Sequence, residues 1–406
     1  MTNLPRAKFL DRETPPHVLT LVLIAGLGAM SMSAFLPSLP TMTEDLNTRY
    51  DVMQLSVSGY LAVTAVLQLV IGPISDRYGR RIVLLGGQAI FVVATLGCIL
   101  APTVEVFLAF RMLQGAVAVG IVLSRAVVRD MYEQDQAASM IGYVTMGMAL
   151  VPMIAPSIGG AVDHAFGWRA VFACLLAAGF LVMVLTWFDL GETSRGGGIS
   201  FSQQFREYPE LLSSPRFWGY VFAAAFASGA FFAFLGGAPY VASTVFGLSS
   251  FWTGICLGAP AIGYATGNFL SARHAVRLGI NRLIRIGSII AAAGVAVAAL
   301  LEVAGLSSPF IFFAACSFVG LGNGLVIPNA SAGMLSVRPH LAGTASGLGA
   351  AIMIGGGAAL SVFAGITIQR GEGSLPLILI MFGSLVMGLF AILYVMARER
   401  RLQHSA

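Results

Sequence analysis

Long stretches without a charged residue constrain the fold of this chain more than any other feature. Two of them, Val52–Ser75 and Ile82–Val104, are each long enough to cross a bilayer as a helix, which needs about 20 apolar residues. Only 10% of the 406 residues are charged, whereas an average soluble domain has about 25%. Because so few charges cannot cover the surface of a soluble protein, the sequence predicts an integral membrane protein.

The same pattern predicts twelve membrane spans. The other uncharged windows of spanning length are Val18–Leu39, Gln136–Val162, Ala170–Phe188, Ser307–Val337, Leu341–Gln369 and Gly373–Ala397. Val106–Val128 and Leu283–Leu301 span despite internal arginines, and the uncharged run Phe217–Ala272 is long enough for two helices. We therefore expect an all-α membrane protein with twelve transmembrane helices in two pseudo-symmetric six-helix bundles.

An internal repeat supports the division into two bundles. The stretch "IGPISDRYGRRIVLLGG" follows the second span, and "TGNFLSARHAVRLGINRLI" follows the eighth, which aligns Gly267 with Gly72 and Ser271 with Asp76. The longest polar stretch, Asp189–Arg216, lies between the sixth and seventh spans. We expect an N-terminal bundle at 1–188, a central loop at 189–215 and a C-terminal bundle at 216–406. Transporters built from such repeats bind substrate between the halves.

The basic residues set the orientation. With the N-terminus in the cytoplasm, nineteen of the 23 Lys and Arg residues fall in inner segments, and only Arg49, Arg169 and Arg370 lie outside. The positive-inside rule then predicts a multi-pass protein with both termini cytoplasmic. The net charge of +5 is explained by topology, so we expect the lipid bilayer, and no nucleic acid, as the partner of these charges.

The loop "GPISDRYGRR" contains two glycines and an aspartate that membrane topology alone does not explain. Its glycines allow two helices to approach closely, and Asp76 is placed to cap another helix or to pair with an arginine such as Arg129. Such a contact exists in only one arrangement of the two halves. We therefore predict a conformational latch, formed by Gly72, Asp76, Arg77, Gly79, Arg80, Arg81, Arg129 and Asp130.

The loop resembles the signature motif of the major facilitator superfamily. "RMLQG" at Arg111–Gly115 and "GMALVPMIAPSIGGAV" at Gly147–Val162 resemble the fourth-helix and fifth-helix motifs of that family. With "VRDMY", "GWRAVF" and "HLAGTASGL", they are similar to the Bcr/CflA subfamily of bicyclomycin and chloramphenicol/florfenicol exporters. The resemblance implies proton-coupled export of small-molecule drugs across the bacterial inner membrane by alternating access, by a monomer without a cofactor.

One departure from the family pattern bears on coupling. Relatives commonly read "DMYLP" near the end of the first helix, where this chain reads "SAFLP" and Ser33 replaces the acid. The acidic residues lie in loops or at helix ends, and Asp130 is the nearest to a buried one. An uncoupled facilitator or importer of a small polar solute with the same fold therefore stays an alternative. We expect no enzyme and no metal site, because no His, Cys, Asp or Glu cluster has catalytic or metal-ligand spacing.

Arg111 is the strongest candidate for substrate binding. An arginine inside the bilayer is costly and is by default a functional hypothesis. We expect Arg111 to face the cavity with Gln114 one helical turn away. The structural alternative is that its side chain reaches the outer interface or pairs with helix carbonyl groups. Its permanent positive charge, with no acid in the middle of the membrane, favours neutral or anionic substrates.

Weaker candidates for substrate binding lie on the other helices that we expect to line the cavity. Ser33, Tyr60, Gln68, Asn323 and Asn329 are placed to hydrogen-bond a ligand, unless they bond neighbouring helices instead. Phe231 and Phe234 share a helix face, and with Tyr240 they are expected to form the apolar wall of a drug pocket.

The fifth-helix motif predicts a hinge. Prolines remove helix hydrogen bonds and glycines permit close packing, although generic packing of small residues is the alternative explanation. The hinge residues are Gly147, Pro152, Pro156, Gly159 and Gly160.

Overall fold

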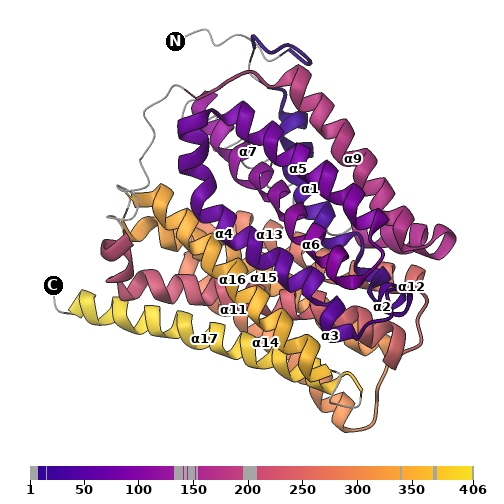
Figure 1. Ribbon diagram of the computed structural model, residues 1–406. Helices are drawn as coiled ribbons and strands as arrows, with labels where there is room; N and C mark the ends of the chain where they lie inside the picture. The colour runs from indigo at the N-terminus through magenta and orange to yellow at the C-terminus, as the bar shows by residue number, and fades with distance from the viewer. Residues whose placement is uncertain are drawn as a thin grey trace.

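The computed structural model describes residues 8–14, 16–131, 140, 144, 151, 154–194, 208–338, 341–368 and 373–404 (Figure 1). All regular structure within these residues is helical. The first bundle contains α1 (Val18–Ser33), η1 (Leu36–Ser38), α2 (Leu39–Asp45), α3 (Tyr50–Met53), α4 (Leu55–Tyr78), α5 (Arg80–Leu100), α6 (Val104–Gln114), η2 (Gly115–Val117), α7 (Ala118–Met131) and α9 (Trp168–Asp189). The second contains α11 (Pro215–Tyr240), η3 (Val241–Val245), α12 (Ser250–Leu257), α13 (Ala259–Leu278), α14 (Ile280–Val303), α15 (Pro309–Val337), α16 (Ala342–Ile368) and α17 (Leu375–His404).

Ten helical spans in the described residues are long and apolar enough to cross a membrane. Their outward faces carry large apolar side chains, such as Val93 and Phe180, that lipid accommodates and water does not. The predicted eighth span is divided between α12 and α13, which meet at Gly258. The predicted fifth span lies partly outside the described residues, and its described end, residues 154–166, is helical. The predicted all-α membrane fold is confirmed.

Buried apolar side chains hold the helices together, and one large hydrophobic cluster contains residues of both bundles. Phe91, Phe107 and Phe172 are fully buried and join α5, α6 and α9. In the second bundle, glycines bring backbones together, because a Cβ at Gly267 of α13 would overlap the carbonyl oxygen of Leu321 on α15. Small residues at such contacts supply the van der Waals packing that holds helices together in lipid.

The internal repeat is visible in the backbone of two turns. Gly79, between α4 and α5, has φ 96° and ψ 145°, and Gly279, between α13 and α14, has φ 79° and ψ 151°. Both values belong to a region that only glycine occupies readily. Counted from these glycines, Asp76 corresponds to Val276, which is fully exposed. The sequence alignment of Asp76 with Ser271 is therefore wrong, because it followed the helix glycines instead of the turn glycines.

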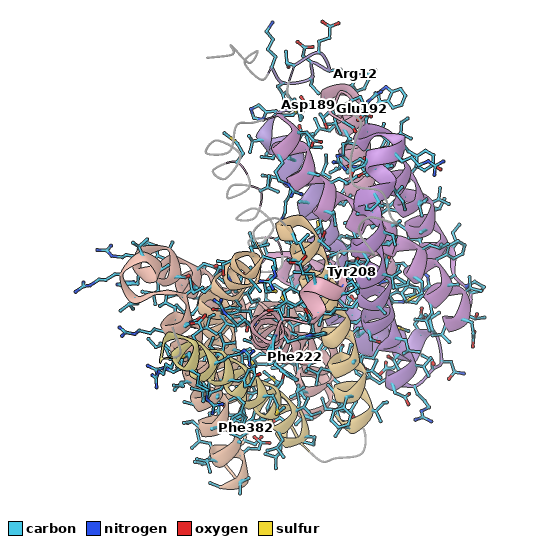
Figure 2. The ribbon with its side chains drawn as sticks, turned by 90° about the vertical axis from the view of Figure 1, so that its left-hand side faces the viewer. Arg12, Asp189, Glu192, Tyr208, Phe222 and Phe382 are labelled. Atoms are coloured by element: carbon cyan, nitrogen blue, oxygen red, sulfur yellow. The ribbon has the colours of Figure 1, made fainter. Side chains whose placement is uncertain are left out.

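The two bundles meet along α4 and α16 and also at one end of the molecule. We call this the Tyr50 end, where α3 and α12 lie, and the opposite one, where α4 turns into α5, the Gly79 end. Helix α16 runs along α4, and a Cβ at Gly355 would lie 3.8 Å from the Cβ of Ala65. Figures 1 and 2 show the bundles joined at the Tyr50 end and inclined to one another.

Candidate functional site

Arg111 is completely buried inside the first bundle. Its Nε donates to the carbonyl oxygen of Ser56 at 3.0 Å, and its Nη2 donates to the carbonyl oxygen of Ser31 at 2.9 Å. Its Nη1 donates to Ser31 Oγ at 3.1 Å and to Gln114 Oε1 at 2.6 Å. Four of the five guanidinium N–H groups are thus bonded to neutral oxygens. The arginine joins α6 to α1 and α4.

Aromatic rings complete the surroundings of this guanidinium. Its central carbon lies 4.2 Å from the ring centroid of Tyr60 and 4.3 Å from that of Phe35. The Tyr60 hydroxyl donates to the carbonyl oxygen of Gly28 at 3.3 Å. The hydrogen-bond network extends to α5, because Gln114 Nε2 donates to Thr95 Oγ1 at 2.7 Å. Cation–π contacts of this kind stabilise a charge where water is absent.

The structure therefore places Arg111 among helix carbonyl groups, as the structural alternative expected, and places Gln114 beside it as predicted. In this conformation four of its five donors are occupied inside the bundle. The charge itself is not neutralised, because none of its hydrogen bonds is to a carboxylate. Phe35 and Thr95 were missed, because ring contacts and hydroxyl acceptors have no sequence signal of their own.

The other polar candidates differ in what they contact. Ser33 Oγ donates to the carbonyl oxygen of Ala29 within its own helix. Asn329 joins α15 to α13 by donating to Ser271 Oγ at 2.7 Å. Gln68 is half-buried on α4, facing α16. Asn323 is 3% exposed, and its Oδ1 has no hydrogen-bond partner among the described residues. Of this set, Asn323 alone offers a buried free acceptor.

The aromatic candidates separate into two places. Phe231 and Phe234 stack with ring centroids 6.2 Å apart, so their predicted shared face is real. Phe234 is fully buried against Phe312 and Phe313 of α15. Tyr240 instead packs against Tyr50 of the first bundle, with centroids 5.0 Å apart. These three aromatic residues do not form a single wall in this conformation.

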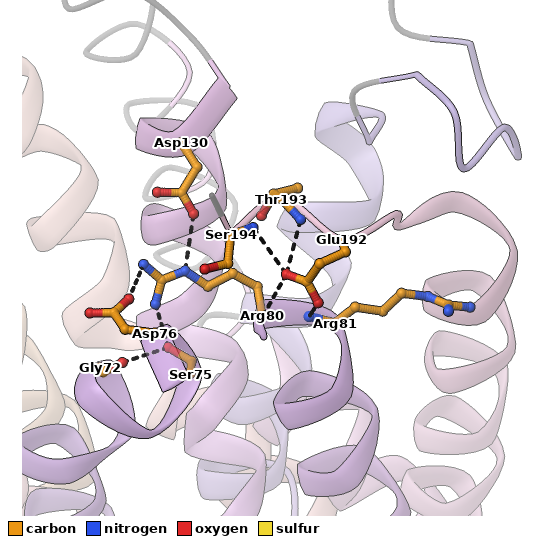
Figure 3. Close-up of polar contacts among 9 residues, drawn as sticks. All are labelled: Gly72, Ser75, Asp76, Arg80, Arg81, Asp130, Glu192, Thr193 and Ser194. Atoms are coloured by element: carbon orange, nitrogen blue, oxygen red, sulfur yellow. Dashed lines mark hydrogen bonds and ion pairs between the residues drawn. The ribbon is translucent and has the colours of Figure 1, made fainter. Parts of the chain in front are cut away.

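The latch residues form an ion-pair network within the first bundle (Figure 3). Arg80 Nη2 lies 2.5 Å from Asp76 Oδ1, and Arg80 Nε lies 3.0 Å from Asp130 Oδ2. Arg80 also donates to Ser75 Oγ, which in turn donates to the carbonyl oxygen of Gly72. Asp76 thus pairs with an arginine, but the arginine is Arg80. The network joins the ends of α4, α5 and α7.

The remaining latch residues lie around this network. Arg129 is exposed at the end of α7, and Arg77 is exposed with its guanidinium over the ring of Tyr78. Arg81 packs on Trp187, 4.9 Å from the ring centroid, and donates to the Trp187 carbonyl oxygen at 3.1 Å. Arg81 therefore contacts the end of α9 and has no bond to Asp76.

Glu192 is a member of the network that the sequence did not reveal. Its carboxylate accepts hydrogen bonds from the backbone N–H groups of Arg80 at 2.8 Å and Arg81 at 3.3 Å (Figure 3). It also accepts from the N–H groups of Thr193 and Ser194. A negative charge at the first turn of α5 is stabilised by the helix dipole. A Cβ at Gly79 would overlap this carboxylate, so the glycine also makes room for Glu192.

The described part of the hinge lies where the bundles touch. A Cβ at Gly159 would overlap the carbonyl oxygen of Ala34, and a Cβ at Gly160 would overlap that of Ser250 on α12. A Cβ at Gly254 of α12 would likewise overlap the carbonyl oxygen of Pro156. Gly147 and Pro152 lie outside the described residues.

Hydrogen bonds close the two bundles against each other at the Tyr50 end. The Tyr50 hydroxyl donates to the carbonyl oxygen of Gly236 at 3.0 Å. Gln54 Nε2 donates to Ser361 Oγ at 2.9 Å and also contacts the Ser361 carbonyl oxygen. Gly365 leaves space for the Gln54 side-chain amide, which a Cβ at this position would overlap. No sequence pattern indicated these pairs, because their members lie some 180 to 310 residues apart.

Comparison with known proteins agrees with this geometry. The model of the Major Facilitator Superfamily matches residues 21–362. The chain is 33% identical to the chloramphenicol resistance protein of Pseudomonas aeruginosa, over 78% of this chain and 76% of that protein. It is 29% identical to multidrug resistance protein D of Escherichia coli strain K12, over 91% and 93% of the two chains.

A crystal structure shows the same fold. It is that of a bacterial homologue of the human lysosomal transporter Spinster, in an inward-facing and occupied conformation, with a TM-score of 0.73 and 19% identity over 94% of this chain and 96% of that one. The motif resemblance to drug-resistance exporters is confirmed by the relatives' names. This chain belongs to the major facilitator superfamily, a family of membrane transporters.

Proposed function

We propose that this protein is a secondary active transporter that exports small drugs or metabolites across the bacterial inner membrane by alternating access. The observation that carries the proposal is the closure of the two bundles at the Tyr50 end by Tyr50 and Gln54. Alternating access requires such a contact to form in one state and to break in the other. Hydrogen bonds of single side chains can break and form again during such a cycle.

The orientation follows from the basic residues. Arg77, Arg80 and Arg81 gather at the Gly79 end, so the positive-inside rule assigns that end, and both termini, to the cytoplasm. The closed Tyr50 end then faces outward, and the conformation is the one that takes substrate from the cytoplasm. We keep the proposed division into bundles 1–188 and 216–406 with the loop 189–215 between them, and we propose that the protein works as a monomer.

The substrate class follows from one buried charge and from the relatives' names. Arg111 holds a positive charge that no carboxylate neutralises, so we propose neutral or anionic substrates. Chloramphenicol, which names one relative, is the first compound to test. The proposed substrate contacts are Asn323, whose Oδ1 has no hydrogen bond to the residues that the structure describes, and the half-buried Gln68 and Phe231.

Coupling to protons requires a carboxyl group that gains and loses its charge during the cycle. Asp130 is already paired with Arg80. Asp163 is a better candidate, because it is only 6% exposed and its Oδ1 has no hydrogen-bond partner among the described residues. We propose Asp163 as the coupling group that replaces the acid missing at Ser33.

Chloramphenicol transport by proteoliposomes tests both parts of the proposal. We expect uphill movement when a pH gradient is imposed and none when it is collapsed. In the Asp163→Asn variant, movement down the drug's own gradient should persist while the response to pH disappears, and Asp51→Asn serves as the matched control. Transport that ignores the pH gradient in the unmodified protein would exclude proton coupling.

The second candidate function is an uncoupled facilitator. It is favoured by Ser33, whose hydroxyl is bonded within its own helix and cannot replace a carboxylate in proton transfer. Downhill movement of chloramphenicol that ignores the pH gradient in every variant would select it.

A further inference from the structure

A groove opens on the outer surface of the second bundle, between the first half of α11 and the last half of α17. Its volume is about 440 Å³, within the range of small-molecule sites. Its walls are almost entirely apolar. Phe222 is 40% exposed, Phe390 61% and Tyr394 51%, so the groove is open to the surroundings of the bundle, and in a membrane these are lipid.

One wall is a ladder of aromatic rings on α11. Trp218 and Phe222 stack with centroids 5.1 Å apart, and Phe226 follows at 6.0 Å. Figure 2 shows Phe222 beside α17. Rings at every fourth residue make a flat, rigid surface one helical turn after another, which suits an extended hydrocarbon chain.

The groove is closed at the Gly79 end. Trp218 Nε1 donates to the carbonyl oxygen of Leu212 at 2.7 Å, which folds the segment before α11 across the groove. Leu212 and Ser213 then form its floor. The indole N–H is satisfied within the protein, so the Trp218 ring presents only its apolar surface to an occupant.

A cation lies beside this closed end. Arg398 is exposed and follows Tyr394 by four residues, so it continues the α17 face that lines the groove. Its neighbour Glu399 is bonded to Arg216 of α11 at 2.7 Å, which sets Arg398 level with the first turn of α11. Arg400 is also exposed, but it points to a different side of α17.

We propose that this groove binds one anionic phospholipid, with an acyl chain along Trp218 and Phe222 and the phosphate beside Arg398. Apolar walls that end at an arginine match a molecule with a hydrocarbon chain and a negative head. The orientation proposed above makes it a lipid of the cytoplasmic leaflet, where anionic lipids attract juxtamembrane arginines. The groove itself depends on neither the substrate nor the coupling.

Trp218 provides the measurement, because brominated acyl chains quench tryptophan fluorescence on contact. The protein is reconstituted in phosphatidylcholine with increasing fractions of brominated phosphatidylglycerol or, separately, brominated phosphatidylcholine. The Trp218 signal is the difference between the unmodified protein and its Trp218→Phe variant. We expect half-maximal quenching at a severalfold lower fraction of the anionic lipid.

Charge variants locate the head group. Arg398→Gln should raise the required fraction of phosphatidylglycerol about fivefold, the effect of one charge at a membrane surface, and Arg398→Lys should restore it. Arg400→Gln, the matched control, should leave it unchanged. Equal quenching by the two lipids in the unmodified protein would overturn the proposal. So would an equal effect of Arg398→Gln and Arg400→Gln, which would indicate general surface charge.

Discussion

At the scale of single residues, Arg111 shows how a membrane protein holds a charge without a counter-ion. An arginine in the bilayer centre is costly, and here carbonyl oxygens, a hydroxyl, an amide and two rings replace its hydration. The guanidinium suits this role better than an ammonium group, because its planar N–H groups bond in several directions while its faces stack.

We expect Arg111→Lys to destabilise the protein although it keeps the charge. Lysine cannot reach Ser31, Ser56 and Gln114 together, and breaking a buried charged network costs about 3–5 kcal/mol. The melting temperature in detergent should fall by several degrees, and transport should be lost. Arg49→Lys, at an exposed ion pair, is the control, and an unchanged melting temperature for Arg111→Lys would show that the network is not structural.

At the scale of elements, the turn between α4 and α5 combines a glycine-only backbone with a carboxylate cap. The equivalent turn at Gly279 has the same backbone angles, but a Cβ there would have nothing within 4 Å. The two bundles therefore have the same kind of turn, but only the turn at Gly79 has a carboxylate packed against its glycine. The ion pairs Asp76–Arg80–Asp130 belong to the first bundle alone.

The pair of turns gives a matched experiment. Gly79→Ala and Gly279→Ala should each lose about 1–3 kcal/mol from backbone strain. Only Gly79→Ala should also displace Glu192 and weaken the first turn of α5. We expect a larger fall in melting temperature and in transport for Gly79→Ala. Equal losses for the two variants would mean that Glu192 contributes nothing.

The ion pair itself is tested by Asp76→Asn. Its carboxylate is partly exposed, so its loss should change stability little, whereas transport should fall severalfold if the pair positions α4 relative to α5 and α7. Asp51→Asn is matched in exposure, at 22% for each side chain, and should transport normally. Full transport by Asp76→Asn would remove this residue from the latch.

Helices and loops were predictable from this sequence because membrane spanning depends on local composition, and the uncharged windows of about 20 residues form helices where the structure describes them. The hydrogen-bond partners of Arg111 could not be predicted, because two of them are backbone carbonyl groups, which are present at every position. Glu192 was missed because it lies among polar loop residues that look alike. Gln54 and Ser361 were missed because their pairing depends on how the bundles meet.

At the scale of the whole molecule, closure at the Tyr50 end combines close packing of the two bundles with a few polar contacts. Tyr50 begins α3, and Gln54 lies between α3 and α4. Their partners Gly236 and Ser361 lie in α11 and α16. An opening there would break these bonds together. Each of these hydrogen bonds contributes about 1 kcal/mol to the preference for the closed state.

We expect Tyr50→Phe to raise the ratio of open to closed molecules at this end about fivefold, because it removes one such bond and keeps the ring. Spin labels at the exposed positions Arg49 and Leu306, in a cysteine-free background, report the separation by double electron–electron resonance. Tyr240→Phe makes the same chemical change on the facing ring, whose hydroxyl makes no hydrogen bond to a described residue, and should leave the distances unaltered. Identical distance distributions for Tyr50→Phe and the parent would contradict this account.

The contacts of Asp189 bear on the order in which the chain acquires its structure. Its carboxylate accepts hydrogen bonds from the N–H groups of Leu10 at 2.6 Å and His17 at 2.9 Å, across 179 and 172 residues. The two ends of the first bundle are thus tied together by its last helical residue. Because domains fold from the N-terminus during synthesis, the first bundle can close as soon as Asp189 and Glu192 have been made. The ribosome would then add the second bundle to a partner already in its final form.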